Sequence, residues 1–280
     1  MTHQGSSLLR NNYFITVLNS TAVFIIAYLF VYLVYQFATV LMAADYEIQT
    51  ILYYNTIKFI TPDFSSLWNA DSALVIFGVG PLVSVVLGII SFFLFMEMID
   101  DPSTLKLFLL WGSVHFFIRT FSSFTIGTIF FLYGSNLVAD WLRVGWGGKM
   151  MLSILSIAFI TVIGIFSTNA FVQSSNSLHL IKNKVRMSFI VCQVLLPWLI
   201  GSSIIILVEL PDITLHEMLI MASFIFVVTQ ILWRNHQFVL YGQESEIPEQ
   251  QLRISWITII IVIVFVITFR LGLNQGIYFG

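Results

Sequence analysis

The sequence is poor in charged residues. Asp, Glu, Lys and Arg make up 9% of its 280 residues, whereas a typical soluble domain contains about 25%. Hydrophobic residues make up 58%, and the mean hydropathy is +0.94. Because so few polar side chains cannot cover a surface that faces water, we expect the lipid bilayer to be the main solvent of this chain.

Cysteine and excess basic charge are scarce as well. Cys192 is the one cysteine in the sequence, which excludes an internal disulfide bond and a multi-cysteine metal cluster. The formal net charge is −2, so there is no broad basic field of the kind that favours nucleic acid. We therefore expect no nucleic-acid partner.

Motifs for catalysis and metal binding are also missing. The sequence contains no GxSxG, Walker-type or CxxC pattern. No Asp or Lys lies clearly inside a long apolar run, and no pair of histidines has the spacing of a zinc-binding helix. The scattered histidines considered as ligands are His115, His179, His216 and His236. We therefore expect no metal, no cofactor and no catalytic residues.

What the sequence does contain is long apolar runs, and a transmembrane helix needs about 20 such residues. These runs predict an all-α polytopic transmembrane helical bundle, organised as a single transmembrane domain over residues 1–280, with short interfacial segments between spans. The seven predicted spans are residues 13–43, 73–96, 105–133, 150–171, 188–208, 215–233 and 254–269.

Two connections carry interfacial character. Residues 45–71 mix aromatic and polar side chains with proline, which predicts an interfacial or re-entrant segment. Residues 138–146 alternate apolar, aromatic and charged side chains, which suits a short helix at the membrane surface. Thr214 and Glu217 form a capping-box pattern before the span at 215–233.

Glycine and proline interrupt two of the predicted spans. Gly78, Gly80 and Pro81 permit a bend and a close backbone approach near the start of the second span. They could line a site or serve tight helix packing, and small residues spaced by four favour packing. Pro197 predicts a kink in the fifth span.

His115 and Arg119 are the sharpest internal feature, because residues four apart share one face of a helix. A charged group inside a span usually faces protein or water. One interpretation is a polar site for an anion, a proton relay or an ion pair with another subunit. The alternative is a structural ion pair between Arg119 and a buried carboxylate such as Glu97 or Asp140.

One order of features resembles the site-2-protease (M50-like) membrane family. In that family, a helix with an HEXXH motif is followed by a membrane-associated segment and by a helix opened by a Gly-Pro motif. Here Tyr35, Gln36 and Thr39 stand where the motif has His, Glu and His, and Gly80-Pro81 opens the later helix. These three side chains are poor zinc ligands and bases. The resemblance therefore implies a zinc-free relative used as a scaffold.

Basic residues near the span ends predict the orientation. Seven on one side exceed four on the other, which places the N-terminus in the cytoplasm and the C-terminus outside, in the inner (plasma) membrane of a bacterium. The first side contains Arg10, Lys106, Lys182, Lys184, Arg186, Arg234 and Arg253, and the second contains Lys58, Arg143, Lys149 and Arg270.

Three functions stay open on this basis. We favour a non-catalytic membrane scaffold or a subunit of a larger membrane or envelope complex, whose partners are the lipid bilayer and other membrane protein subunits. The first alternative is a transporter or channel subunit that uses the polar site around His115 and Arg119. The second is an intramembrane protease-like enzyme, with Asp140 or Asp71 as acid–base groups beside His115.

Overall fold

The computed structural model describes residues 2–98, 103–131, 134–175, 178–181, 183–237 and 252–280. This part of the chain is almost entirely helical, and seven of its helices are long and apolar enough to cross a membrane. The prediction of a seven-span helical membrane protein is therefore confirmed. The spans lie in α1 (Thr2–Asp45), α2 (Ala70–Glu97), α3 (Thr104–Phe130), α5 (Trp146–Gln173), the fifth span at Val185–Glu209, α9 (Leu215–Arg234) and α10 (Trp256–Asn274).

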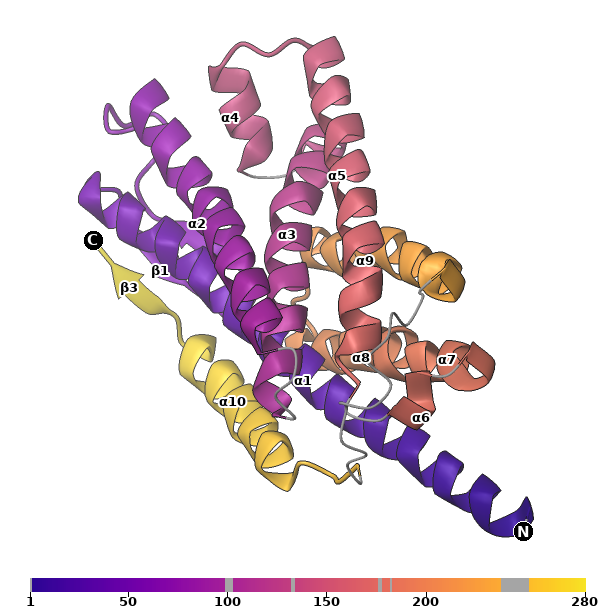
Figure 1. The fold of residues 1–280 in the computed structure, drawn as a ribbon. Coiled ribbons are helices and arrows are strands. Elements are labelled where there is room, and N and C mark those ends of the chain that lie inside the picture. The colour runs from indigo at the N-terminus through magenta and orange to yellow at the C-terminus, as the bar shows by residue number, and fades with distance from the viewer. Residues whose placement is uncertain (1, 99–102, 132–133, 176–177, 182, 238–251) are drawn as a thin grey trace.

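Two helices form the centre of the bundle. Helix α1 crosses the whole molecule and contacts α2, α3, α8 (Leu196–Glu209) and α10, and α3 contacts α2, α5 and α9 (Figure 1). Aromatic rings from separate helices meet between them, with Trp111 of α3 packed against Phe24, Phe171 and Phe224. Burial agrees with the central position of α3 and the outer position of α10. In the most apolar stretch of each helix, 67% of the residues of α3 are buried, against 11% of those of α10.

Several helix ends differ from the predicted spans. Helix α3 ends at Phe130, and Phe131 takes a left-handed conformation; residues 132 and 133 of the predicted span lie outside the described residues. Helix α10 runs to Asn274 instead of ending at 269, so Arg270 lies inside the helix. The chain turns away only at Gly276, which has the positive φ of 76° that glycine tolerates best.

The connection at 45–71 folds into a small sheet that the sequence did not predict. Strands β1 (Thr50–Leu52) and β2 (Ile57–Phe59) form a hairpin, and β3 (Ile277–Phe279) pairs antiparallel with β1 to give the order β2-β1-β3. Each strand has three residues, too few to show an alternating pattern. The third strand also comes from the far end of the sequence.

The second connection contains a short helix, α4 (Ser135–Trp141), which begins and ends earlier than the predicted segment 138–146. Its Asp140 forms an ion pair with Lys149 at the start of α5, with 2.5 Å between the carboxylate and ammonium groups. Lys149 also donates to the side chain of Asn136. These contacts tie α4 to the end of the next span.

The fifth span changes its helical form before Pro197. A short helix α6 (Leu178–Ile181) precedes α7 (Asn183–Ile190), which continues through a π-helical turn η1 (Val191–Leu195) into α8. Proline has no N–H to offer the carbonyl of Gln193, four residues earlier. The Ser20 hydroxyl of α1 donates to that carbonyl at 2.7 Å, and the Trp111 indole donates to Ser20 at 3.0 Å.

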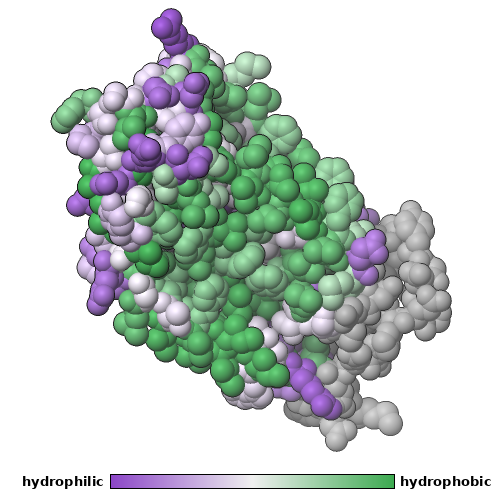
Figure 2. Space-filling view, turned by 90° about the vertical axis from the view of Figure 1, so that its left-hand side faces the viewer, coloured by the Kyte–Doolittle hydropathy of each residue, from purple (hydrophilic) through white to green (hydrophobic). Residues whose placement is uncertain are grey.

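The outer surface is apolar over most of the face seen in Figure 2, with hydrophilic residues gathered toward its upper left. Large exposed hydrophobic side chains lie on α2, α5 and α10, among them Leu82, Phe93, Ile154, Phe166 and Ile257. A surface of this kind is compatible with a lipid bilayer.

Candidate functional site at the centre of the bundle

Arg119 of α3 forms a bidentate ion pair with Glu217 of α9. Its two terminal nitrogens donate to the two carboxylate oxygens, at 3.0 Å and 2.7 Å. The side chains are 3% and 2% exposed. A buried pair with two parallel hydrogen bonds is the arrangement that best offsets the cost of taking both charges out of water.

The local sequence at α9 explains how Glu217 reaches this position. Thr214 caps the helix, and its hydroxyl accepts a hydrogen bond from the Glu217 backbone N–H at 3.2 Å. The predicted capping box is therefore half present. The Glu217 carboxylate turns inward to Arg119, and the His216 ring lies 3.7 Å from it.

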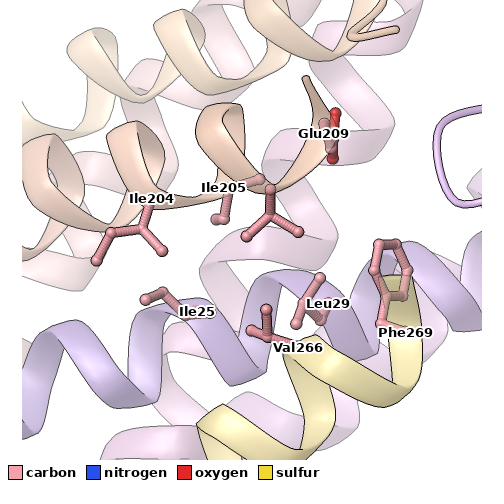
Figure 3. A pocket seen from close by; sticks show the side chains of 8 residues that line it. Ile25, Leu29, Ile204, Ile205, Glu209, Val266 and Phe269 are labelled. Atoms are coloured by element: carbon pink, nitrogen blue, oxygen red, sulfur yellow. The ribbon is translucent and has the colours of Figure 1, made fainter. Parts of the chain in front are cut away.

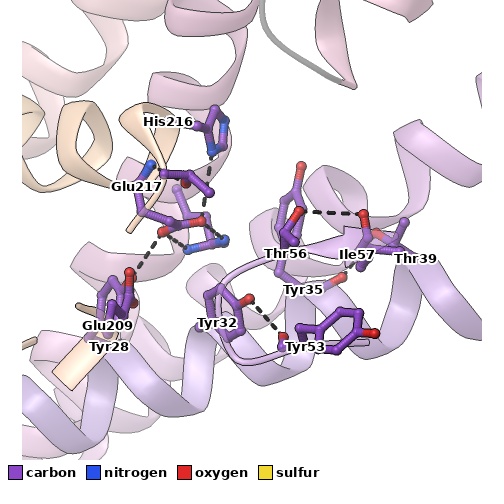
Figure 4. A network of polar contacts seen from close by, with 12 residues as sticks. Tyr28, Tyr32, Tyr35, Thr39, Tyr53, Thr56, Ile57, Glu209, His216 and Glu217 are labelled. Atoms are coloured by element: carbon purple, nitrogen blue, oxygen red, sulfur yellow. Dashed lines mark hydrogen bonds and ion pairs between the residues drawn. The ribbon is translucent and has the colours of Figure 1, made fainter. Parts of the chain in front are cut away.

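A second buried carboxyl group joins this pair through a tyrosine. The Tyr28 hydroxyl of α1 lies 2.9 Å from one oxygen of Glu217 and 3.1 Å from one oxygen of Glu209, the last residue of α8 (Figure 4). Glu209 is 0% exposed. Four helices therefore contribute one side chain each to a single polar centre, which we call the Arg119–Glu217–Tyr28–Glu209 cluster.

Further tyrosines of α1 complete the surroundings of Arg119. Its guanidinium carbon lies 4.8 Å from the ring centre of Tyr32 and 5.0 Å from that of Tyr35. Tyr28, Tyr32 and Tyr35 are spaced by four and three residues, so they share one face of the helix. The cation thus has a carboxylate on one side and aromatic faces on others, which are favourable contacts for a desolvated guanidinium.

His115 lies in an aromatic environment beside the cluster. Its ring centre is 4.5 Å from that of Phe24, 4.7 Å from Phe224 and 5.9 Å from Tyr28. The structure therefore brings the two residues singled out on α3 into one core, as the spacing of four implied. Arg119 faces the carboxylates, while His115 faces aromatic rings.

The β1–β2 hairpin lies over the α8–α9 turn next to the cluster. The Tyr32 hydroxyl donates to the backbone carbonyl of Tyr53 in the hairpin at 3.3 Å. The hydroxyl of Tyr54 donates to the Asp212 carboxylate at 2.8 Å. Arg270 donates to the carbonyl of Leu210 at 3.1 Å, and its guanidinium carbon lies 3.7 Å from the Tyr54 ring centre.

Tyr35 and Thr39, two of the residues that stand where the HEXXH motif would be, lie against Gly80 of α2. A Cβ atom added to Gly80 would lie 2.9 Å from the ring of Tyr35 and 3.1 Å from the hydroxyl of Thr39. Thr39 donates to the backbone carbonyl of Tyr35, and Gln36 beside them is half-buried. By contrast, a Cβ atom on Gly78 would meet nothing within 4 Å. Pro81 stays within α2, and Thr120 donates to its carbonyl at 3.3 Å.

The expected partners of Arg119 were wrong. Glu97 is exposed at the end of α2, and Asp140 pairs with Lys149, so neither approaches Arg119 as an ion-pair partner. Asp71, the other acid considered beside His115, is exposed in the first turn of α2. In the described residues, no three His, Cys, Asp or Glu side chains gather as metal ligands would.

Sequence reasoning missed Tyr28, Tyr32 and Glu209, and it treated Glu217 as a capping residue. Two signals could have pointed to them. The tyrosines recur on one face of the first span, and Glu209 and Glu217 flank a connection of five residues between two apolar spans. Acids at such facing helix ends lie close together in space, since short connections join antiparallel neighbours.

Two crevices accompany these features without reaching the ion pair. One lies between α1, α8 and α10, is lined by apolar side chains such as Leu29, Ile205 and Phe269, and has Glu209 at one end (Figure 3). The other lies nearer the N-terminus of α1, and its lining includes the polar residues Asn19 and Gln193. Neither is lined by Arg119 or Glu217.

No protein-family model, curated protein or solved structure matches this chain. One guanidinium, two carboxyl groups and three phenols in a region shielded from water can hold helices together and can hold protons. The acids considered as catalytic partners of His115 do not lie beside it. Asp140 pairs with Lys149, and Asp71 is exposed at the start of α2.

Proposed function

We propose that this chain is a non-catalytic integral membrane scaffold or a subunit of a larger membrane complex. The observation that carries the proposal is the bidentate pair between Arg119 and Glu217. The intramembrane cation, which would otherwise contact a solute or substrate, is used to join α3 to α9. The rings of Tyr32 and Tyr35 from α1 lie against its guanidinium group, and Tyr28 of the same helix contacts Glu217.

The outer helices supply the surface that such a role needs. Helices α2, α5 and α10 bury 33%, 28% and 11% of their apolar windows within the chain. Their remaining faces are open to lipid and to apolar faces of other membrane subunits. Association in lipid depends on close packing and interhelical hydrogen bonds.

We also propose the bacterial inner membrane as the location, with the N-terminus in the cytoplasm. The alternation of seven spans then puts the sheet, α4 and the α8–α9 turn on the outer side. The excess of Lys and Arg on the other side supports this orientation, although Lys182, one of the residues counted, lies outside the described residues.

The proposed kinship with site-2 proteases has one structural feature in its favour. Gly80 of the Gly-Pro sequence packs against Tyr35 and Thr39, two of the positions that correspond to the metal-binding motif. The expected protein is zinc-free, since neither side chain is a good zinc ligand. Metal analysis of protein purified without chelators should find no stoichiometric zinc, and one zinc per chain would contradict the proposal.

A paired apolar replacement tests the scaffold role. In Arg119→Met with Glu217→Leu, both buried charges are removed together, a change that is often neutral or stabilising. We expect the double variant to accumulate and to co-purify, after cross-linking in native membranes, with the same stoichiometric companions as the wild type. Each single variant should accumulate poorly, because it leaves one buried charge unpaired.

The wild type and the double variant together also distinguish a scaffold from a transporter. A wild-type chain that purifies alone and moves a solute in proteoliposomes would contradict the proposal. So would a double variant that folds with the wild-type unfolding temperature but loses that flux. Retained companions with unchanged membrane permeability in both proteins would support it.

A further inference from the structure

We propose that Glu209 is a proton-binding site inside the membrane-spanning region, and that its carboxyl group carries a proton in this structure. The site lies where α8 ends, between α1 and α10, and is linked by Tyr28 to the Arg119–Glu217 pair. The inference does not depend on the scaffold role, because it concerns the ligand that this carboxyl group binds. That ligand is a proton.

The first argument is a count of hydrogen atoms. The Tyr28 oxygen lies within hydrogen-bond distance of both Glu209 and Glu217, but a phenol has one O–H group to donate. The second contact therefore needs a hydrogen atom from a carboxyl group. Both oxygens of Glu217 already accept from the two nitrogens of Arg119. Glu209 is left as the group that donates to the Tyr28 oxygen.

The second argument is the environment of the other Glu209 oxygen. This Oε2 atom is buried, and no described residue donates a hydrogen bond to it. Glu209 is also one of the residues that line the crevice between α1, α8 and α10, whose other lining residues are apolar (Figure 3). The crevice is too narrow to admit a water molecule. A charged carboxylate would be solvated here by neither protein nor water, whereas a neutral carboxylic acid is tolerated.

The third argument concerns the charged and titratable groups around Glu209. From α3, Arg119 is committed to Glu217, and His115 lies among aromatic rings. From α10, Arg270 donates through one terminal nitrogen to the Leu210 carbonyl and lies over the Tyr54 ring, while its other terminal nitrogen is buried with no hydrogen-bond partner among the described residues. The ion pairs found among these residues do not join Arg270 to Glu209. Tyr32 of α1 stacks beside Tyr28, and His216 of α9 adjoins Glu217.

The crevice has an inner and an outer side. Its inner wall is formed by buried residues, including Ile25 and Phe269, while Ile204 is exposed and Val266 is half-buried on the outer side. Tyr28 links the Glu209 carboxyl group inward to Glu217, and this contact is the path by which its proton could move.

Infrared difference spectroscopy reads the protonation state directly. We expect wild-type protein at neutral pH to show the carbonyl band of one protonated carboxylic acid that is absent from Glu209→Gln. In Tyr28→Phe this band should persist and move to higher frequency, because the acid loses its hydrogen-bond partner. If the wild type and Glu209→Gln differ instead in a carboxylate band, the proposal is wrong.

A comparison of unfolding temperatures in detergent gives an independent test. Glutamine has the shape and neutrality of a protonated glutamate, so Glu209→Gln should unfold within about two degrees of the wild type. The matched Glu217→Gln variant should unfold at a clearly lower temperature or fail to accumulate, because Arg119 loses its counter-charge. A marked rise or fall in Glu209→Gln would show that the native group is charged, and would overturn the proposal. Replacement of sodium by potassium should leave both results unchanged, and a sodium-dependent result would point to a metal cation as the ligand.

Discussion

At the scale of single residues, the fold depends on how one intramembrane cation is accommodated. A charged side chain at the centre of a span costs about 2.5–3.5 kcal/mol on insertion scales. Arg119 offsets this cost through two hydrogen bonds to Glu217 and through the faces of Tyr32 and Tyr35. The planar guanidinium suits both contacts, since its nitrogens form a fork and its face can stack.

Arg119→Lys should therefore destabilise the protein although the charge is kept. Lysine can neither form the bidentate pair nor stack on the tyrosine rings, and we expect a loss of about 1–3 kcal/mol, the cost of weakening hydrogen bonds to charged groups. Reversible unfolding in mixed detergent measures this loss. Arg143→Lys, at an exposed position, is the control and should have no effect. Equal stability of Arg119→Lys and wild type would mean that the fork geometry contributes nothing.

The two glycines near the head of α2 make a matched pair. Gly80→Ala forces a methyl group against Tyr35 and Thr39 and should cost about 1–3 kcal/mol, as overpacking of a core does. Gly78→Ala meets open space and should stabilise the helix by about 0.5–1 kcal/mol. Unfolding of the two variants side by side checks the contrast. Two variants of equal stability would argue against the close approach of α1 and α2.

At the scale of elements, the fifth span shows how a helix interruption is accommodated by a neighbour. Pro197 withholds an N–H from the Gln193 carbonyl, and a π-helical turn lies immediately before it. Ser20 of α1 supplies a donor to that carbonyl and accepts from Trp111 of α3. One hydroxyl thus links three elements at the interruption.

Ser20→Ala should remove this link and leave a buried carbonyl and a buried indole N–H without their partner. We expect a destabilisation of about 1–3 kcal/mol, the cost of unsatisfied buried polar groups. Ser203→Ala, in α8 of the fifth span, is the matched control. Its exposed hydroxyl donates to the Leu199 carbonyl of its own helix, so its loss should change stability by less than about 0.5 kcal/mol.

At the scale of the whole molecule, the proposed topology of seven spans would put the two chain ends on opposite sides of a membrane. The sheet joins the C-terminal strand β3 to the hairpin that follows α1. It lies at the end of the bundle that also holds the α8–α9 turn, through the contacts of Tyr54 and Asn55 with Asp212. At this end of the bundle, backbone pairing therefore joins segments that are far apart in the sequence.

Topology mapping tests the proposed orientation. Single cysteines placed at exposed positions of a Cys192→Ser background should react differently with a membrane-impermeant thiol reagent added to intact cells. We expect labelling at Phe64, beside the sheet, and at Trp146, at the start of α5, because both lie on the proposed outer side and are exposed. Leu105, at the start of α3 and also exposed, should react only after lysis. The reverse pattern would invert the orientation.

The sequence was enough to predict the seven membrane-spanning helices, because a long apolar run satisfies its own backbone hydrogen bonds in lipid only as a helix. It was also enough to single out Arg119, since a charge inside such a run is conspicuous. It did not reveal that Glu217 is the partner of Arg119 rather than Glu97 or Asp140. That choice depends on which helix ends approach α3, and no local pattern encodes this approach. Glu209 was not singled out either, because an acid at the end of a span ordinarily faces water.

The residues alone therefore determined the solvent of this protein, its class and the places where its backbone crosses the membrane, because these follow from apolar length and the need to satisfy every backbone hydrogen bond internally. Only the tertiary structure decided that Tyr28, Arg119, Glu209 and Glu217 form one buried cluster and that three short strands from both ends of the chain form one sheet. Such contacts join segments far apart in the sequence, and their geometry exists only once the helices have packed.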